Sequence, residues 1–188
     1  MPKLIKTVPF ETAFGNNCHA EEKAIGLINN LLENNKGIII GDCDYLPYAK
    51  KFIARNIKQL KEMNVKHLFL DFENCKNTQG MILQAQENDI QVIGIKLPVE
   101  NSEIQPWVKL IKNFYNGIGN NEKFIILCKS NRISNNAPGY SGAGIESLLK
   151  MPAISTYSEC PYDENTLTKV FKNKDIYNLF YKQDSCYY

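Results

Sequence analysis

The residues best suited to chemistry are acidic side chains at the ends of two apolar runs. Asp42 and Asp44 follow the run GIIIG, whereas Asp71 and Glu73 stand at and just after the end of the run KHLFLDF. Carboxylates that meet at one edge of a sheet bind a divalent cation through oxygen, or hold raised pKa values that suit acid–base work. Asp42, Asp44 and Asp71 are therefore candidate catalytic and metal-binding residues, with Glu73 assisting and a divalent cation as the candidate cofactor.

A second set of candidates follows from the same strand ends. Asn131, which comes shortly after the run KFIILC, is a further candidate catalytic residue. Four residues are predicted to line the pocket or to assist: Cys43, Asn74, Cys128 and Tyr140.

Two other interpretations of these side chains stay open. In the first, Asp42 or Asp44 only caps the following helix, and Asp71 and Glu73 are solvated edge residues. In the second, a cysteine such as Cys43 or Cys128 acts as a nucleophile with His19 or His67 as its base.

The elements that must position these residues are apolar runs that alternate with helical patterns. Five runs read as strands: 37–41, 66–72, 90–97, 123–128 and, more weakly, 152–157. The helical patterns are 20–34, 47–63, 78–88, 103–116 and 142–150. Continuous apolar runs are typical of strands covered on both faces. We predict a three-layer α/β/α sandwich on a mostly parallel sheet of about five strands, with its site at the carboxyl ends of the strands.

The chain is predicted to form one domain of 188 residues. Residues 1–19 are taken as an N-terminal extension, 20–157 as the core and 158–188 as a C-terminal helical tail. The helical expectation for the tail rests on apolar residues at helical spacing between positions 163 and 182.

Composition limits the classes of function. A net charge of +2 does not suggest nucleic-acid binding, and no apolar run reaches the length of a transmembrane segment. The beginning of the chain lacks the apolar region of a Sec signal peptide. Six scattered cysteines without a CxxC pair indicate free thiols in a reducing compartment. A cytoplasmic setting is expected.

Two long stretches carry a resemblance to a known superfamily. YAKKFIARNIKQLKEMNVKHLFLD resembles the helix and second strand of the first βαβ unit in the ChaN-like, erythromycin-esterase-like and TIKI superfamily, in which the preceding strand ends in Gly-Glu-x-His. EKFIILCKSNRISNNAPGYSGAGIESLLKMPAISTY is similar to its second motif, in which a strand ends in Gly-x-x-His. The resemblance covers roughly residues 25–157, and members also occur as domains of bacterial toxins and effectors.

The resemblance implies a site in which the key residues have changed. The family's Glu and His correspond to Asp42 and Asp44, the second-motif Gly and His correspond to Cys128 and Asn131, and the second-strand carboxylate is kept as Asp71. In active members, these histidines and carboxylates are thought to bind a metal or to serve as the base in hydrolysis. Both imidazoles, whose pKa suits work near neutral pH, are replaced here.

We therefore expect a degenerate, non-catalytic member that acts as an effector-like or binding domain. Its location would be the cytoplasm, or a host cytosol after delivery, and its protein or small-molecule partner is not identified by the sequence. The alternative is a metal-dependent hydrolase of esterase or peptidase type that uses Asp42, Asp44 and Asp71.

Overall fold

The computed structural model describes residues 18–20, 24–42, 48–71, 78–95, 104–129, 133, 144–158 and 176–181, and these form one parallel sheet flanked by helices. The strands are β1 (Cys18–Ala20), β2 (Gly37–Asp42), β3 (Val65–Asp71), β4 (Gln91–Ile95), β5 (Lys123–Lys129), β6 (Ala153–Ser158) and β7 (Ile176–Tyr181). Their order across the sheet is β1-β7-β6-β2-β5-β3-β4, and every neighbouring pair is parallel. The carboxyl ends of all seven strands therefore lie at one edge.

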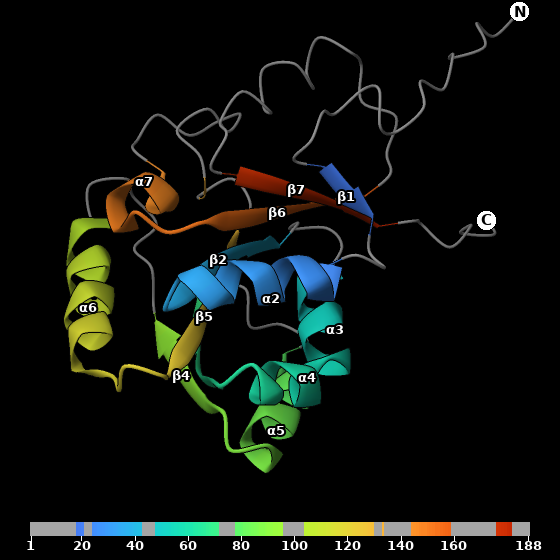
Figure 1. The fold of residues 1–188 in the computed structure, drawn as a ribbon, viewed down its shortest axis with the longest axis horizontal. Helices are drawn as coiled ribbons and strands as arrows, with labels where there is room; N and C mark the ends of the chain where they lie inside the picture. The colour runs from blue at the N-terminus through green and yellow to red at the C-terminus, as the bar shows by residue number, and fades with distance from the viewer. Residues whose placement is uncertain are drawn as a thin grey trace, which may run out of the picture.

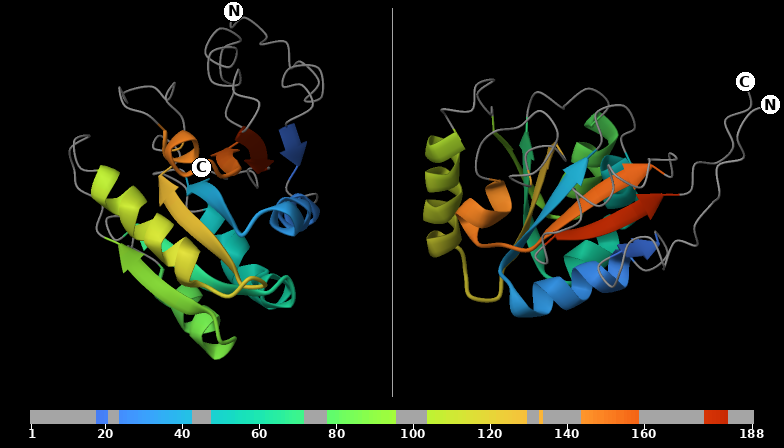
Figure 2. Two further views of the ribbon diagram at one scale, coloured as in Figure 1. Left: turned by 60° about the vertical axis from the view of Figure 1, so that its left-hand side comes forward. Right: turned by 90° about the horizontal axis from the view of Figure 1, so that it is seen from above.

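Helices connect these strands and cover both faces of the sheet (Figure 1). They are α2 (Ala24–Asn34), α3 (Tyr48–Arg55), α4 (Ile57–Glu62), α5 (Gln79–Glu87), α6 (Ile104–Gly117) and α7 (Ile145–Leu149). Helices α2 to α5 pack on one face through a core that includes Ile40, Leu70 and Leu127. Helices α6 and α7 pack on the other face, over Phe69 and Ile126. Figure 2 shows the two helical layers on either side of the sheet.

The central strands are apolar on both faces because both faces are covered. Every residue of β2 is buried, and the five inner residues of β5 are buried as well. Successive side chains of a strand point to opposite faces, so each strand supplies both cores in alternation. The predicted α/β fold is confirmed, and the five predicted strands correspond to β2, β3, β4, β5 and β6.

The expected helical tail is wrong where the structure describes it. Residues 176–181 form β7, which lies inside the sheet between β1 and β6. The sequence IYNLFY is rich in the aromatic and β-branched residues that favour strands, and pairing with two neighbours decides its conformation. The sheet consequently has seven strands rather than about five, and residues 18–20 of the expected N-terminal extension belong to it as β1.

Two helix boundaries also differ from expectation. The pattern at 47–63 forms two helices that meet at Asn56, whose side-chain amide donates a hydrogen bond to the Phe52 carbonyl oxygen. A side chain that bonds to the preceding turn competes with regular helix geometry. The first helix begins at Ala24 rather than at residue 20.

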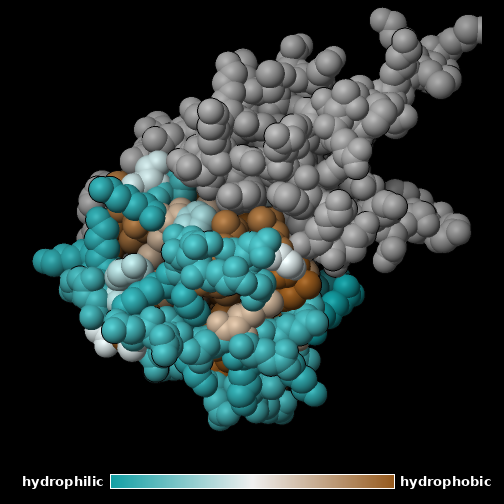
Figure 3. All heavy atoms as spheres, viewed as in Figure 1, coloured by the Kyte–Doolittle hydropathy of each residue, from teal (hydrophilic) through white to brown (hydrophobic). Residues whose placement is uncertain are grey.

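In the ranges that the structure describes, no helix is both long and apolar enough to cross a membrane. Seen from the side of Figure 1, the described surface is mostly hydrophilic over α3, α4 and α5 (Figure 3).

Candidate functional site

The candidate carboxylates lie at the same edge of the sheet, but their strands are not neighbours. Asp42 ends β2 and Asp71 ends β3, and β5 lies between these two strands. Order along the chain does not fix order in the sheet, so β2 and β3 are separated although they follow one another in the sequence. The two strand ends are two spacings apart, about 10 Å.

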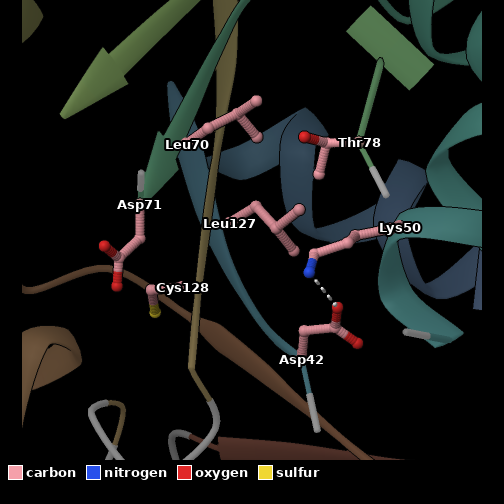
Figure 4. Close-up of a pocket in the computed structure, with 7 residues that line it drawn as sticks. All are labelled: Asp42, Lys50, Leu70, Asp71, Thr78, Leu127 and Cys128. Atoms are coloured by element: carbon pink, nitrogen blue, oxygen red, sulfur yellow. Dashed lines mark ion pairs between the residues drawn. The ribbon is translucent and has the colours of Figure 1, made fainter. Parts of the chain in front are cut away.

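Asp42 and Asp71 also point to opposite faces of the sheet. Asp42 follows the alternation of Ile38 and Ile40, which face α2 to α5. Asp71 follows Phe69, which faces α6 and α7. Figure 4 shows the Asp42 carboxylate on one side of β5 and the Asp71 carboxylate turned away from it on the other.

Asp42 is bound into the start of α3. Its side chain is 4% exposed, and Oδ1 accepts a hydrogen bond from the backbone N–H of Ala49 at 3.1 Å. Lys50 places its Nζ 3.6 Å from Oδ2. The carboxylate thus satisfies one of the first N–H groups of the helix and opposes the positive end of the helix dipole. The capping contact considered for Asp42 is present, and its candidate roles in catalysis and metal binding stay predictions.

A small hollow lies beside this pair at the strand ends (Figure 4). Its cavity volume is about 10 Å³, and its lining residues are Asp42, Lys50, Leu70, Asp71, Thr78, Leu127 and Cys128. A cavity of this size holds about one water molecule, so it does not accommodate a large cofactor.

The other face of the same edge carries a row of residues at one level. Gly41 pairs with Ser155 of β6 on one side and with Cys128 of β5 on the other. Leu127 pairs with Leu70, so one residue further along both strands Cys128 comes level with Asp71. We call Ser155, Gly41, Cys128 and Asp71 the edge row. Its three side chains point toward the α6 and α7 layer, and each is at most 2% exposed.

Glu146 is a further buried carboxylate, and it lies in the helical layer that covers this face. It lies in α7, is 3% exposed, and accepts a hydrogen bond at Oε1 from the Ser147 hydroxyl at 3.0 Å. A Cβ at Gly144 would collide with Glu146 Oε2 and with the carbonyl oxygen of Ile133. Glu146 therefore sits against Ile133, which follows the carboxyl end of β5 in the chain.

Several predicted site residues lie outside the described residues. These are Cys43, Asp44, Glu73, Asn74, Asn131 and Tyr140. Their roles stay predictions, and so does any convergence of Asp44 with Asp42 or Asp71.

The cysteine–histidine interpretation is wrong for the pair that the structure describes. His67 pairs with Phe124, four residues before Cys128 on β5, so the two side chains lie about 13 Å apart along the strands. Its ring instead packs edge-on against Phe114 with centroids 4.7 Å apart, and its nitrogens face Gln91 Oε1 at 3.2 Å and Glu122 Oε2 at 3.4 Å. His67 is a structural residue near the amino end of the sheet.

The described side chains do not assemble a metal centre. Within the described ranges, no three His, Cys, Asp or Glu residues lie close enough together to hold an ion. The Lys50 ammonium lies beside the Asp42 carboxylate. A metal cation bound to that carboxylate would have to compete with the ammonium group.

Sequence reasoning missed four residues of this edge: Lys50, Thr78, Glu146 and Ser155. Lys50 is one of two consecutive lysines in α3, and only tertiary packing decides which of them points inward. Ser155 offered a usable signal, because a hydroxyl at the carboxyl end of a buried parallel strand is out of place in a purely apolar core.

The fold is similar to that of solved bacterial toxin structures. A structure titled bacterial protein toxins matches with a TM-score of 0.51 and 14% identity, covering 79% of this chain and 37% of that one. The toxin effector domain RRSP, from a MARTX toxin of Vibrio vulnificus CMCP6, matches with a TM-score of 0.51 and 14% identity, covering 71% of this chain and 35% of that one. This chain thus spans little more than a third of their length. No family model and no curated protein matches the sequence.

Proposed function

We propose that this chain is a non-catalytic, effector-like binding domain of the ChaN-like, erythromycin-esterase-like and TIKI superfamily type. The observation that carries the proposal is the state of Asp42, which takes the position of the family's catalytic Glu. Its carboxylate is bound by the Ala49 N–H and by Lys50, and it faces away from Asp71. A carboxylate held this way stabilises a helix start and is poorly placed to share a metal with Asp71.

The effector part of the proposal is supported by the fold that the chain shares with toxin structures, including a MARTX toxin effector domain. In such a role the domain would act in a host cytosol and would recognise a partner through the hollow at the strand ends. This hollow lies at the carboxyl ends of the strands, where parallel α/β folds commonly place their ligand sites.

Metal addition tests the non-catalytic part. We expect 1 mM Mg²⁺, Mn²⁺, Ca²⁺ or Zn²⁺ to change the melting temperature by less than about 1 °C, because a specific site filled at 100 times its Kd would add about 2.7 kcal/mol and several degrees. A larger rise that disappears in Asp42→Asn, or hydrolysis of a substrate in an esterase and peptidase panel that Asp42→Asn abolishes, would overturn the proposal.

Partner capture tests the binding part. A host-cell protein retained by the wild-type chain should be lost with Lys50→Ala at the rim of the hollow and kept with Lys58→Ala, an exposed lysine of α4. Equal retention by both variants would show that the hollow is not the binding site.

One observation favours the alternative of a metal-dependent hydrolase. Asp42 and Asp71 both line the same hollow even though their carboxylates diverge. An ion bridged by Asp42, Asp71 and Asp44 would require Lys50 to leave Asp42. Lys50→Gln should then increase the metal-induced rise in melting temperature, whereas the binding proposal expects no such rise in either protein.

A further inference from the structure

The sheet ends at β4, a strand whose outer side pairs with no other described strand. β4 is last in the order across the sheet, and its neighbour on the inner side is β3. Gln91 and Gly94 are exposed, and Val92 and Ile93 are half-buried. Figure 2 shows β4 at the outer margin of the sheet. Within the described chain, the N–H and C=O groups on this side of β4 are therefore left for a further strand.

β4 carries none of the features that usually protect the edge of a sheet. Its sequence, QVIGI, contains no charged residue and no proline. Its register with β3 runs without a bulge from Gln91 to Ile95. The strand at the other end of the sheet, β1, is only three residues long, and a short strand offers little edge to pair with. Of the two ends, β4 is the one suited to strand addition.

The sequence of β4 is complementary to a second copy of itself in antiparallel orientation. A two-fold axis perpendicular to the sheet keeps every side chain on its own face. When this axis passes beside Ile93, the whole strand is paired. Ile93 then faces Ile93 of the second copy, Gln91 faces Ile95, and Val92 faces Gly94. Gly94 leaves space for the Val92 side chain, and β-branched residues that meet across strands stabilise a ladder.

α6 adds an exposed apolar side chain beside the same edge. Phe114 packs edge-on against His67 and Phe69 of β3, with ring centroids 4.7 and 4.8 Å apart, so this side of α6 lies over β3, next to β4. Leu110 lies one turn earlier on the same side and is 49% exposed. Ile93 packs against the same core cluster as Phe114. Pairing of two copies would therefore bury apolar surface on this face in addition to forming backbone hydrogen bonds.

We propose that the chain forms a two-fold dimer in which β4 pairs antiparallel with β4 of a second copy and joins two seven-stranded sheets into one. Each copy uses the one long edge that its described strands leave unpaired, so the assembly closes at two chains. One strand makes most of the contact, and small interfaces of this kind are transient. In dilute solution the monomer dominates and β4 stays open. This surface is separate from the hollow, and the proposal does not depend on the function proposed above.

Sedimentation equilibrium of the full chain tests the dimer. The weight-average mass is expected to rise from one chain toward two as the concentration increases from about 10 µM to about 1 mM. Over the same range, amides of β4 should gain protection from hydrogen exchange, whereas amides of β2, which is paired on both sides, should not change. A mass that stays at one chain, or that passes two chains without levelling off, overturns the proposal.

Charged substitutions at the two-fold axis test the register. Ile93→Lys and Ile93→Glu each place like charges opposite one another, so each should raise the dissociation constant of the dimer at least about tenfold. A mixture of the two should associate more tightly than either alone, because opposite charges then meet. Leu83→Lys is the matched control, since Leu83 is exposed on the side of α5 opposite the buried Met81 and Ala85, and it should leave association unchanged. Wild-type association of Ile93→Lys, or no gain on mixing two folded variants, contradicts the proposal.

A cysteine variant decides the question if the charged variants do not fold. Antiparallel partners have Cα atoms about 4.5 to 5.5 Å apart, within the range that a disulfide spans. Mild oxidation of Ile93→Cys should therefore link two copies through position 93, which mass spectrometry of the linked peptide identifies. Leu83→Cys and the wild-type chain measure the background from the other thiols. If linked dimers are no more abundant in Ile93→Cys than in Leu83→Cys, the proposed pairing is wrong.

Discussion

At the scale of single residues, the role of Asp42 is decided by what its two carboxylate oxygens contact. Oδ1 accepts the Ala49 N–H and Oδ2 lies beside Lys50, so the side chain joins the end of β2 to the start of α3. The sequence placed this carboxylate correctly at the strand end. It could not show the direction of the side chain or its contact with Lys50, because both depend on how α3 packs against the sheet.

Substitution of Asp42 should destabilise the fold. We expect Asp42→Ala to lower the free energy of unfolding by about 2 kcal/mol, because it removes a helix-capping acceptor and leaves Lys50 without this carboxylate. Asp42→Asn should cost about half as much, since its amide oxygen can still accept the Ala49 N–H. Urea unfolding measures both. Asp89→Ala, which breaks an exposed pair with Lys61, is the control and should cost no more than about 0.5 kcal/mol. A gain in stability with Asp42→Asn would contradict the capping role.

Glu122 makes stability depend on pH at the opposite end of the sheet. The hydrogen bond with His67, together with the N–H that Gly119 donates at 3.2 Å, holds the pKa of Glu122 below its ordinary value. A carboxyl group with a lowered pKa in the folded state adds stability above its unfolded pKa of about 4.3. That contribution is lost as the pH falls through the folded pKa.

The measurement compares wild-type and Glu122→Gln unfolding from pH 7 to pH 3. The variant should be less stable than wild type above about pH 5, and the difference should shrink toward zero as the carboxylate protonates. Glu87→Gln, on an exposed turn of α5, should follow the wild-type curve. A stability difference between wild type and Glu122→Gln that does not change with pH would show that the charge of Glu122 is not responsible.

At the scale of elements, local patterns identified the strands but not their order. Runs such as GIIIG and FIILC are apolar throughout, and burial on both faces favours their formation of strands. Neither run predicts that β5 lies between β2 and β3. This non-local arrangement separates Asp42 from Asp71. The expectation of a helix at IYNLFY was wrong for a related reason. Its apolar residues continue a helical spacing from upstream residues, but pairing with β6 and β1 makes this segment a strand.

Removal of β7 tests its place inside the sheet. A chain that ends at residue 175 loses the strand between β1 and β6 and should expose the edge of β6. Exposed strand edges pair with other chains, so we expect a lower melting temperature and a larger aggregated fraction by light scattering. The matched control ends at residue 181 and keeps β7. Equal stability of the two truncated chains would contradict the seven-stranded sheet.

At the scale of the whole molecule, burial decreases from the centre of the sheet, where helices cover both faces, to the edge at β4. All residues of β2 are buried, whereas β4 at the end of the sheet is exposed at Gln91 and Gly94. The candidate site sits at the carboxyl ends of the most buried strands, β2 and β5. Its backbone is thus held by neighbours on both sides, which is the arrangement that keeps a binding site rigid.

The protection of backbone amides from hydrogen exchange should decrease in the same order, from β2 and β5 to β4. Amides of β2 and β5 are expected to exchange only when the whole domain unfolds, because both strands are paired on two sides and covered on two faces. Amides of β4 should exchange at least about tenfold faster through local opening, which corresponds to a free-energy difference above about 1.4 kcal/mol. Repeating the exchange at two pH values confirms that opening is at equilibrium. Equal protection of β4 and β2 would mean that something covers the β4 edge, and the edge would then have to be treated as an interface.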